Sequence, residues 1–184
     1  MIGNVSSETT IPKLKEFVRA GGRIVAIGPS SINIGQQFGF PITNHLVERT
    51  PTGTAGTRLP SEKFYVPGSL LEVAYDTTAD AARGQEGHGV VFYDNSPVFR
   101  LGPDAAAKGL KPIAWFDSAS PLKSGWAWGQ NYLDQGVAMA EGTYGQGMVY
   151  MFGPEITFRA QPHGTFKLLF NAITGPPPAT RVVP

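Results

Sequence analysis

The chain has 184 residues, of which 41% are hydrophobic, and it contains no cysteine. This length and composition suffice for one globular domain with a buried core, and the lack of thiols excludes disulfides, thiolate metal sites and a cysteine nucleophile. Fifteen Lys and Arg residues nearly balance fourteen Asp and Glu residues, for a formal net charge of +1, so charge does not favour nucleic acid as a partner. No apolar stretch approaches the length of a membrane span and no signal peptide is visible, so no membrane insertion is expected.

The first part of the chain predicts an alternation of helices and strands. Apolar residues recur at helical spacing between a cap at Thr9 or Thr10 and a stop at Gly21 and Gly22. An apolar run follows that is typical of a buried strand, and a second helical pattern comes after it. The expected elements are a helix over 11–18, a strand over 23–27 and a helix over 31–38.

The second part predicts short strands and one closing helix. The expected strands lie at 70–74, 90–93, 98–100 and 113–116, after a loop over 51–56. Strands at 137–141 and 148–152 flank the glycine-rich segment 142–147, which predicts a hairpin with a loop longer than the tightest turns. Apolar residues on one face of 166–173, with Thr165 as a cap, predict the last helix.

This order of elements predicts one α/β domain over residues 1–175, followed by a Pro-rich tail over 176–184. We expect a three-layer sandwich of the flavodoxin-like or amidotransferase-like type, with an antiparallel hairpin near the C-terminus. Such a fold normally opens with strands, whereas this chain opens with a helix. The first strands are therefore expected to be missing, which would leave an exposed sheet edge near 23–27.

Four segments in fixed order carry a resemblance to a known family; they are 14–28, 64–71, 92–99 and 163–173. Together they resemble the C-terminal region of large bacterial zinc-carboxypeptidase-like proteins. In that family a metallopeptidase domain related to carboxypeptidase A is followed by a domain similar to class I glutamine amidotransferases. The resemblance implies that this chain is the later part of the amidotransferase-like domain, without the peptidase.

The resemblance also locates the family's catalytic positions. Class I amidotransferases hold a cysteine in a G-x-C-x-G turn after a strand, where backbone donors can stabilise an oxyanion. Ser30 stands at the cysteine position and Ile32 at that of the second glycine. The family's F-H-P-E segment matches Phe152–Glu155, so Gly153 replaces the histidine base while Glu155 is retained. The resemblance therefore implies a degenerate active site.

A serine hydrolase is the first alternative. It would use Ser30 as the nucleophile, His163 as a substitute base and Glu155 to orient that base. The simpler interpretation is that Ser30 or Ser31 caps the following helix and that His163 caps or orients the last helix.

A zinc peptidase is the second alternative. His45 and Glu48 form an H-x-x-E pair, the first half of the zinc site in carboxypeptidase A relatives, and His163 lies far downstream as a third ligand. That chemistry also needs a glutamate base beyond the last histidine, and no acidic residue follows His163.

Two segments are candidate binding sites. In the glycine-bounded stretch around Trp126 and Trp128 we expect the two indoles on opposite faces, one in the core and one exposed beside Asn131, where it could stack on a sugar or a peptide side chain. Asp94 and Asn95 follow the carboxyl end of a strand, where open α/β sheets place ligands, although they are also typical of a turn.

The sequence therefore favours a non-catalytic accessory or binding domain. No cofactor is expected for this chain, because zinc belongs to the peptidase domain of the parent family. The expected partners are that missing N-terminal peptidase domain, or a second copy through the exposed edge, and the expected ligand is a peptide or a glycan. The chain itself gives no localisation, whereas the resemblance implies an exported, periplasmic or secreted parent protein.

Overall fold

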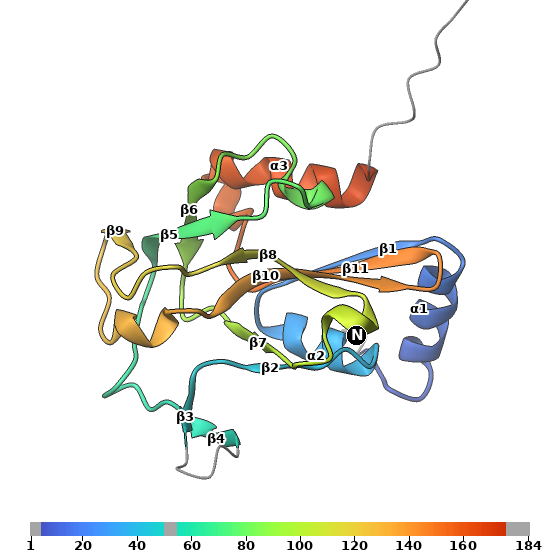
Figure 1. Cartoon of the computed structure of the whole chain (residues 1–184), viewed down its shortest axis with the longest axis horizontal. Coiled ribbons are helices and arrows are strands. Elements are labelled where there is room, and N and C mark those ends of the chain that lie inside the picture. The colour runs from blue at the N-terminus through green and yellow to red at the C-terminus, as the bar shows by residue number, and fades with distance from the viewer. Residues whose placement is uncertain (1–4, 50–54, 176–184) are drawn as a thin grey trace, which may run out of the picture.

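A curled mixed sheet dominates the computed structural model, which describes residues 5–49 and 55–175 (Figure 1). Its main path has the order β1-β11-β10-β8-β5-β6, with β2, β7 and β9 paired beside it, and β3 and β4 form a separate ribbon. The helices are α1 (Thr10–Arg19), α2 (Ser31–Gln37) and α3 (His163–Thr174). The strands are β1 (Arg23–Ile27), β2 (Ile42–Asn44), β3 (Val47–Arg49), β4 (Ala55–Arg58), β5 (Ser69–Tyr75), β6 (His88–Tyr93), β7 (Phe99–Leu101), β8 (Leu110–Trp115), β9 (Leu122–Ser124), β10 (Val137–Tyr144) and β11 (Gly147–Phe152).

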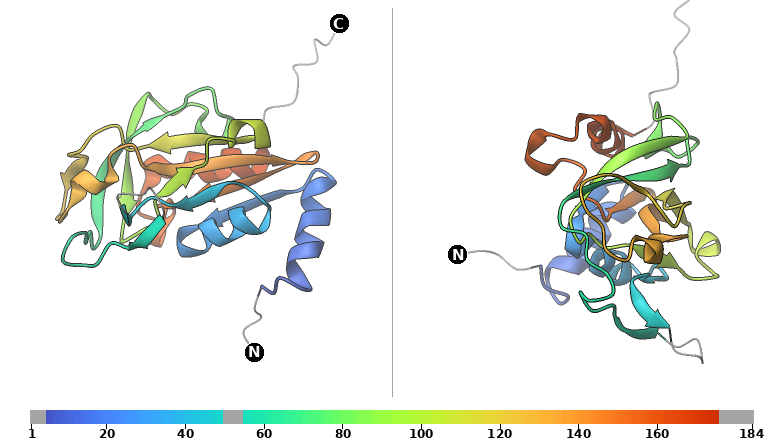
Figure 2. Two further views of the ribbon diagram at one scale, coloured as in Figure 1. Left: turned by 60° about the horizontal axis from the view of Figure 1, so that its bottom comes forward. Right: turned by 90° about the vertical axis from the view of Figure 1, so that its left-hand side faces the viewer.

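Helices cover both faces of this sheet (Figure 2). Side chains alternate between the faces of a strand, and β11 shows this directly. Tyr150 and Phe152 belong to the hydrophobic cluster that includes Leu168 of α3, whereas Val149 and Met151 belong to a second cluster, against which α1 and α2 pack. The predicted mixed α/β class is confirmed, but only β1 and β11 pair in parallel and the other strand pairs are antiparallel.

The expected hairpin is present, but its predicted loop was wrong. The pairing of β10 with β11 continues to Tyr144 opposite Gly147, so Gly145 and Gln146 alone form the turn. Gly145 adopts a φ of 62°, a left-handed conformation that tight hairpin turns require. The glycine-rich segment is therefore mostly strand rather than loop.

Most elements of the sheet were predicted within one or two residues, but four short strands were not. These are β2, β3, β4 and β9, each of three or four residues. The expected loop at 51–56 lies partly outside the described residues, and 55–56 belong to β4. The predicted tail at 176–184 also lies outside them. None of the described helices is long and apolar enough to cross a membrane.

The expected exposed edge is present at β1. This strand pairs with β11 and, within residues 5–49 and 55–175, with no other strand. The backbone N–H of Met148 donates to the carbonyl of Gly22, so alternate residues of β1 bond to β11 and the backbone groups of Val25 face away from it. Phe17 of α1 and Phe170 of α3, both more than half exposed, lie on helices that contact β1.

Glu141 on β10 is a buried carboxyl group whose Oε2 has no hydrogen-bond partner among the described residues. Burial, together with the nearby charge of Asp80, raises its pKa above the ordinary value of 4.5. The folded state then binds a proton more tightly than the unfolded state, so the free energy of unfolding falls as the pH rises above 4.5. We expect Glu141→Gln to raise the free energy of unfolding by about 1 kcal/mol at about pH 8 and to change it little at about pH 4.

Urea denaturation of both proteins at the two pH values measures this difference. Glu72→Gln is the matched control, because Glu72 pairs with Lys123 at 2.8 Å on the surface and its loss should change stability by about 0.5 kcal/mol or less. Equal effects of Glu141→Gln at both pH values would contradict the prediction.

Candidate functional site

The strands β1, β11 and β6 run in the same direction, so their carboxyl ends lie at the same end of the sheet. Gly28–Ser30 follow β1 as a 3-10 turn, Gly153 follows β11, and the turn 94–97 follows β6. Ligands of open α/β sheets usually bind at such an edge. The structure therefore brings together the segments that the resemblance assigns to a catalytic site.

Gly153, at the position of the expected histidine base, has no room for any side chain. A Cβ atom there would lie 2.0 Å from the carbonyl oxygen of Pro97 and 3.0 Å from that of Ala138. Both contacts are with backbone, and the N–H of Gly153 donates to the same Ala138 carbonyl at 2.9 Å. The close packing of three chain segments thus excludes a base at this position.

Ser30 is exposed and forms no side-chain capping bond, although it precedes α2 directly. Ser31 is buried, and its hydroxyl donates to the carbonyl oxygen of Gly28 at 2.7 Å. The predicted cap, in which a serine oxygen accepts from free amides of the helix, was therefore wrong. The hydroxyl of Ser31 instead closes the turn that ends β1.

His163 does not join Ser30 in any described cavity. It begins α3, and its Nε2 donates to the carbonyl oxygen of Ala160 at 3.1 Å, as the helix-orienting interpretation expects. It lines a cavity of about 410 Å³ with His88 and Lys167, and neither Ser30 nor Glu155 lines that cavity. The carboxyl group of Glu155 has no pairing with a histidine in the described part of the chain.

The three candidate zinc ligands do not line one common cavity. His45 and Glu48 line one cavity of about 520 Å³, without His163. Glu48 pairs with Lys63 at 2.6 Å, and Nδ1 of His45 lies 3.4 Å from a guanidinium nitrogen of Arg100. No three histidine or carboxylate side chains of residues 5–49 and 55–175 are grouped to hold a metal ion.

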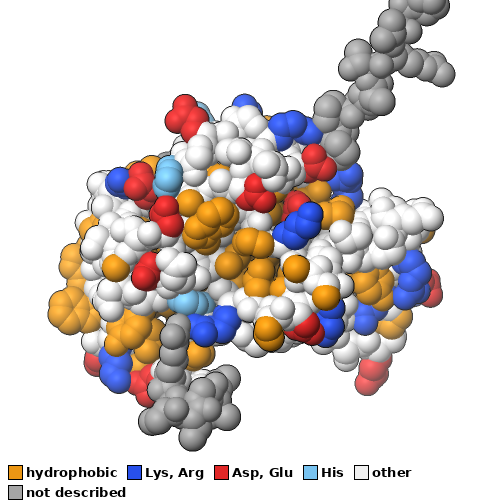
Figure 3. Space-filling model, in the orientation of Figure 1, with side chains coloured by type: hydrophobic (Ala, Val, Ile, Leu, Met, Phe, Trp, Pro, Cys, Tyr) orange, Lys and Arg blue, Asp and Glu red, His pale blue; other side chains and the backbone are white. Residues whose placement is uncertain are grey.

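Four exposed aromatic side chains come from position 65 and the segment 126–132, and they are here called the aromatic surface. Trp126 and Trp128 are 53% and 54% exposed, and Tyr65 and Tyr132 are 42% and 40% exposed. Hydrophobic side chains gather at the left-hand end of the molecule in Figure 3, over the segments between β8 and β10. The expectation that one indole lies in the core was wrong, because side chains two residues apart in an extended segment share a face, and here Ala127 between them points inward.

Hydrogen bonds hold the aromatic surface in place. Trp128 pairs with Tyr65 in an isolated antiparallel bridge, and its indole N–H donates to the carbonyl of Glu62 at 2.8 Å. Trp126 packs edge-on against Tyr65, with ring centroids 6.0 Å apart, and its backbone N–H donates to the hydroxyl of Ser69 at 2.9 Å. The rings are thus exposed but ordered, as a preformed binding surface requires.

A polar cavity adjoins this surface. Tyr132 lines the cavity of His45 and Glu48, together with Lys63, Asn131 and Asp134. These side chains offer both hydrogen-bond donors and acceptors next to an aromatic ring. Such a combination suits a ligand with many hydroxyl groups.

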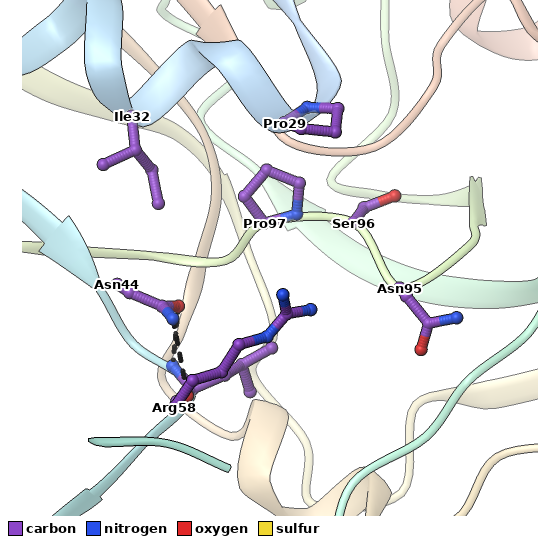
Figure 4. A pocket seen from close by; sticks show the side chains of 8 residues that line it. Pro29, Ile32, Asn44, Arg58, Asn95, Ser96 and Pro97 are labelled. Carbon is purple, nitrogen blue, oxygen red and sulfur yellow. Dashed lines mark hydrogen bonds between the residues drawn. The ribbon is translucent and has the colours of Figure 1, made fainter. Parts of the chain in front are cut away.

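Asp94 and Asn95 form a turn that also lines a cavity. Asn95 has a φ of 42°, and its Oδ1 accepts from the N–H of Val66 at 3.2 Å. Beside this turn lies a cavity of about 190 Å³, lined by Asn95, Pro97 and Arg58 among others (Figure 4). Arg58 and Tyr65 were not predicted as site residues, because each comes from a segment without a motif and only folding brings them to the other site residues.

Known proteins resemble this chain in fold but not in sequence. No family model and no curated protein matches it. A beta-galactosidase from Bacillus circulans sp. alkalophilus aligns with a TM-score of 0.52 and 13% identity, over 90% of this chain and 20% of that protein. A beta-galactosidase from Rahnella sp. R3 aligns with a TM-score of 0.51 and 16% identity, over 92% of this chain and 21% of that protein. The chain thus spans about a fifth of these proteins, and the likeness shows the fold alone.

Proposed function

We propose that this chain is a non-catalytic binding domain of a larger protein and that its aromatic surface binds a glycan. The observation that carries the proposal is the ordered exposure of Tyr65, Trp126, Trp128 and Tyr132 beside a polar cavity. Exposed aromatic rings that gather on one face mark an interaction site more often than chance exposure.

A glycan suits this surface better than a peptide. The apolar faces of sugar rings can stack on aromatic side chains, while the hydroxyl groups at the ring edges need both donors and acceptors. Lys63 and Asn131 supply donors, and Asp134 and Glu48 supply acceptors, in the cavity that Tyr132 also lines. The surface therefore combines the two kinds of contact that a saccharide requires.

The absence of catalysis rests on packing rather than on one lost residue. A base cannot be accommodated at Gly153, because the backbone of Pro97 occupies the space of a Cβ atom. His163 is bound to Ala160 and lines a different cavity from those at the aromatic surface and beside the 94–97 turn. These observations support a site that lies at the expected position in the fold but lacks a catalytic base.

The larger protein is proposed to be zinc-carboxypeptidase-like and exported, as the four ordered sequence segments imply. In this proposal the chain is an amidotransferase-like three-layer sandwich that lacks its first strands. Helices on both faces of the sheet and the unpaired side of β1 support this view. The occurrence of the same fold as about a fifth of two longer proteins supports an accessory role.

Affinity electrophoresis of the 184-residue chain in gels containing neutral or acidic polysaccharides tests the proposed function. We expect retardation by at least one polysaccharide and no labelling of Ser30 by a fluorophosphonate probe. Labelling of Ser30 would favour the serine hydrolase, and free migration in every gel would remove the support for glycan binding.

The edge at β1 is proposed to be covered by association, and in the chain alone we expect a second copy to cover it. An edge strand with free backbone groups is a template for pairing, and Phe17 and Phe170 would add apolar contact. Val25→Pro should reduce this self-association, because it removes an outward N–H and leaves the bonds from Ile24 and Ala26 to β11 intact. Sedimentation velocity over a range of concentrations measures the effect, and a wild-type chain that stays monomeric throughout would contradict it.

A further inference from the structure

A groove leads from the aromatic surface to an arginine at the carboxyl edge of the sheet. Tyr65 and Arg58 both line a cavity of about 230 Å³, together with Phe64 and Ser61. Arg58 and Asn95 also line the adjoining cavity of about 190 Å³, which reaches Pro29 at the end of β1. Arg58 therefore stands between the aromatic surface and the turn that follows β1.

The guanidinium group of Arg58 points into the second cavity, between Asn44 and the 95–97 turn (Figure 4). Five ion pairs join other side chains, and none within residues 5–49 and 55–175 involves Arg58. The charge of Arg58 nevertheless acts on a buried group. Burial raises the pKa of the Tyr93 phenol, and the positive charge of Arg58 works to lower it. A guanidinium group presents a fork of donors that matches the two oxygens of a carboxylate.

The other polar groups around Arg58 are also donors. The Oδ1 atoms of Asn44 and Asn95 already accept backbone N–H groups, from Leu46 at 3.0 Å and from Val66 at 3.2 Å. Each NH₂ group also donates once within the chain, that of Asn44 to the carbonyl of Leu46 at 3.4 Å and that of Asn95 to Oδ1 of Asp94 at 3.2 Å, so one of its two hydrogens remains.

Ser96 adds a further donor. It is buried, and its Oγ accepts from the N–H of Asp94 at 3.3 Å, which leaves its own hydroxyl hydrogen for a ligand. The polar lining of this cavity therefore suits an anion.

The charge and the lining of the two cavities favour a carboxylate as that anion. Arg58 is the one charged side chain among the described residues that line the two cavities, so a single negative charge is balanced there. The remaining wall of the inner cavity is apolar, formed by Pro29, Ile32, Leu46 and Pro97. A phosphate group, which carries more charge and no apolar part, matches this lining less well than a carboxylate on a sugar ring.

We propose that the glycan bound by this domain is acidic, with the carboxylate of a uronate residue paired to Arg58 and a neighbouring ring on Tyr65. This inference rests on the proposed glycan-binding function and names the class of glycan. The cavity at Tyr132 contains Glu48 and Asp134 against Lys63, which pairs with Glu48, so the charge left over is negative and disfavours a carboxylate there. The charged residue is therefore directed to the Arg58 end.

Isothermal titration of the chain with oligogalacturonate, oligomannuronate and oligoglucuronate, and with the methyl ester of each, tests the proposal. We expect one oligouronate to bind about tenfold or more tighter than its own ester, since a charge-assisted pair is lost on esterification. Arg58→Gln should remove this difference, and Arg58→Lys should restore it in part.

Arg19→Gln is the matched control, because it removes the same charge from α1, where Arg19 donates to the Tyr144 hydroxyl at 3.0 Å. It should leave the preference for the free acid unchanged, and thermal unfolding checks that each variant is folded. Equal binding of an acid and its ester, or a preference that survives in Arg58→Gln, would overturn the acidic class while leaving glycan binding intact. Absence of binding by every acid, ester and neutral polysaccharide would instead overturn the proposed function.

Discussion

Trp128→Ala and Trp126→Ala are each expected to weaken glycan binding by about tenfold or more, and the double variant should abolish measurable binding. Each substitution removes a flat apolar ring that the surface presents to the ligand, and such aromatic anchors carry most of the energy of a binding site. Both indoles are more than half exposed, so their loss should cost little folding energy. Affinity electrophoresis and isothermal titration with the best polysaccharide measure the effect.

Trp128→Phe and Phe170→Ala serve as controls for this prediction. Phenylalanine keeps a stacking ring but loses the indole N–H that donates to Glu62, so Trp128→Phe should retain part of the affinity. Phe170 is 60% exposed on α3, outside the aromatic surface, and Phe170→Ala should leave binding unchanged. Wild-type affinity in the double tryptophan variant would show that the ligand binds elsewhere.

Gly153→Ala is expected to lower the free energy of unfolding by about 1–3 kcal/mol or more, and Gly153→His by more still. The obstacle is the backbone of Pro97, 2.0 Å from the added Cβ, and backbone cannot move aside as the end of a flexible side chain can. Gly153→His places a histidine at the position where the resemblance led us to expect a base, yet it should not create a reactive serine. Urea denaturation and fluorophosphonate labelling measure the two parts of this prediction.

Gly164→Ala is the matched control, because this glycine also lacks a side chain but has no atom within 4 Å of an added Cβ. It lies in α3, where alanine favours the helix by up to about 1 kcal/mol, so its stability should be equal or higher. A Gly153→His protein with wild-type stability and a labelled Ser30 would contradict the proposal that the domain is non-catalytic and would support the serine hydrolase.

The elements with strong local patterns were predictable from the sequence. The helices α1 and α3 follow from apolar spacing, and the β10–β11 hairpin follows from two apolar runs joined by glycines. Strands of three or four residues, such as β2 and β9, carry too few side chains for a pattern, and their existence depends on the strands beside them.

Some residues of the candidate site were likewise predictable from the sequence, and others were not. Trp126 and Trp128 stand out in the sequence as an aromatic pair, whereas their exposure depends on Ala127 turning inward to the core. Tyr65 and Arg58 carry no local signal, because each is a common residue type in an irregular or short segment. They became site residues only when the chain brought 58–65 beside 95 and 126–128.

The sequence by itself determined the mixed α/β class and the strand at Arg23–Ile27, since these depend on local pattern and residue identity. Only the tertiary structure decided that Ser30 does not line the cavity of His163, that no three histidine or carboxylate side chains of the described residues are grouped to hold a metal ion, and that Gly153 has no space for a side chain. The physical reason is that spacing along the chain controls which face a residue occupies within one element. Distances between elements are set by packing across the sheet, which no single segment encodes.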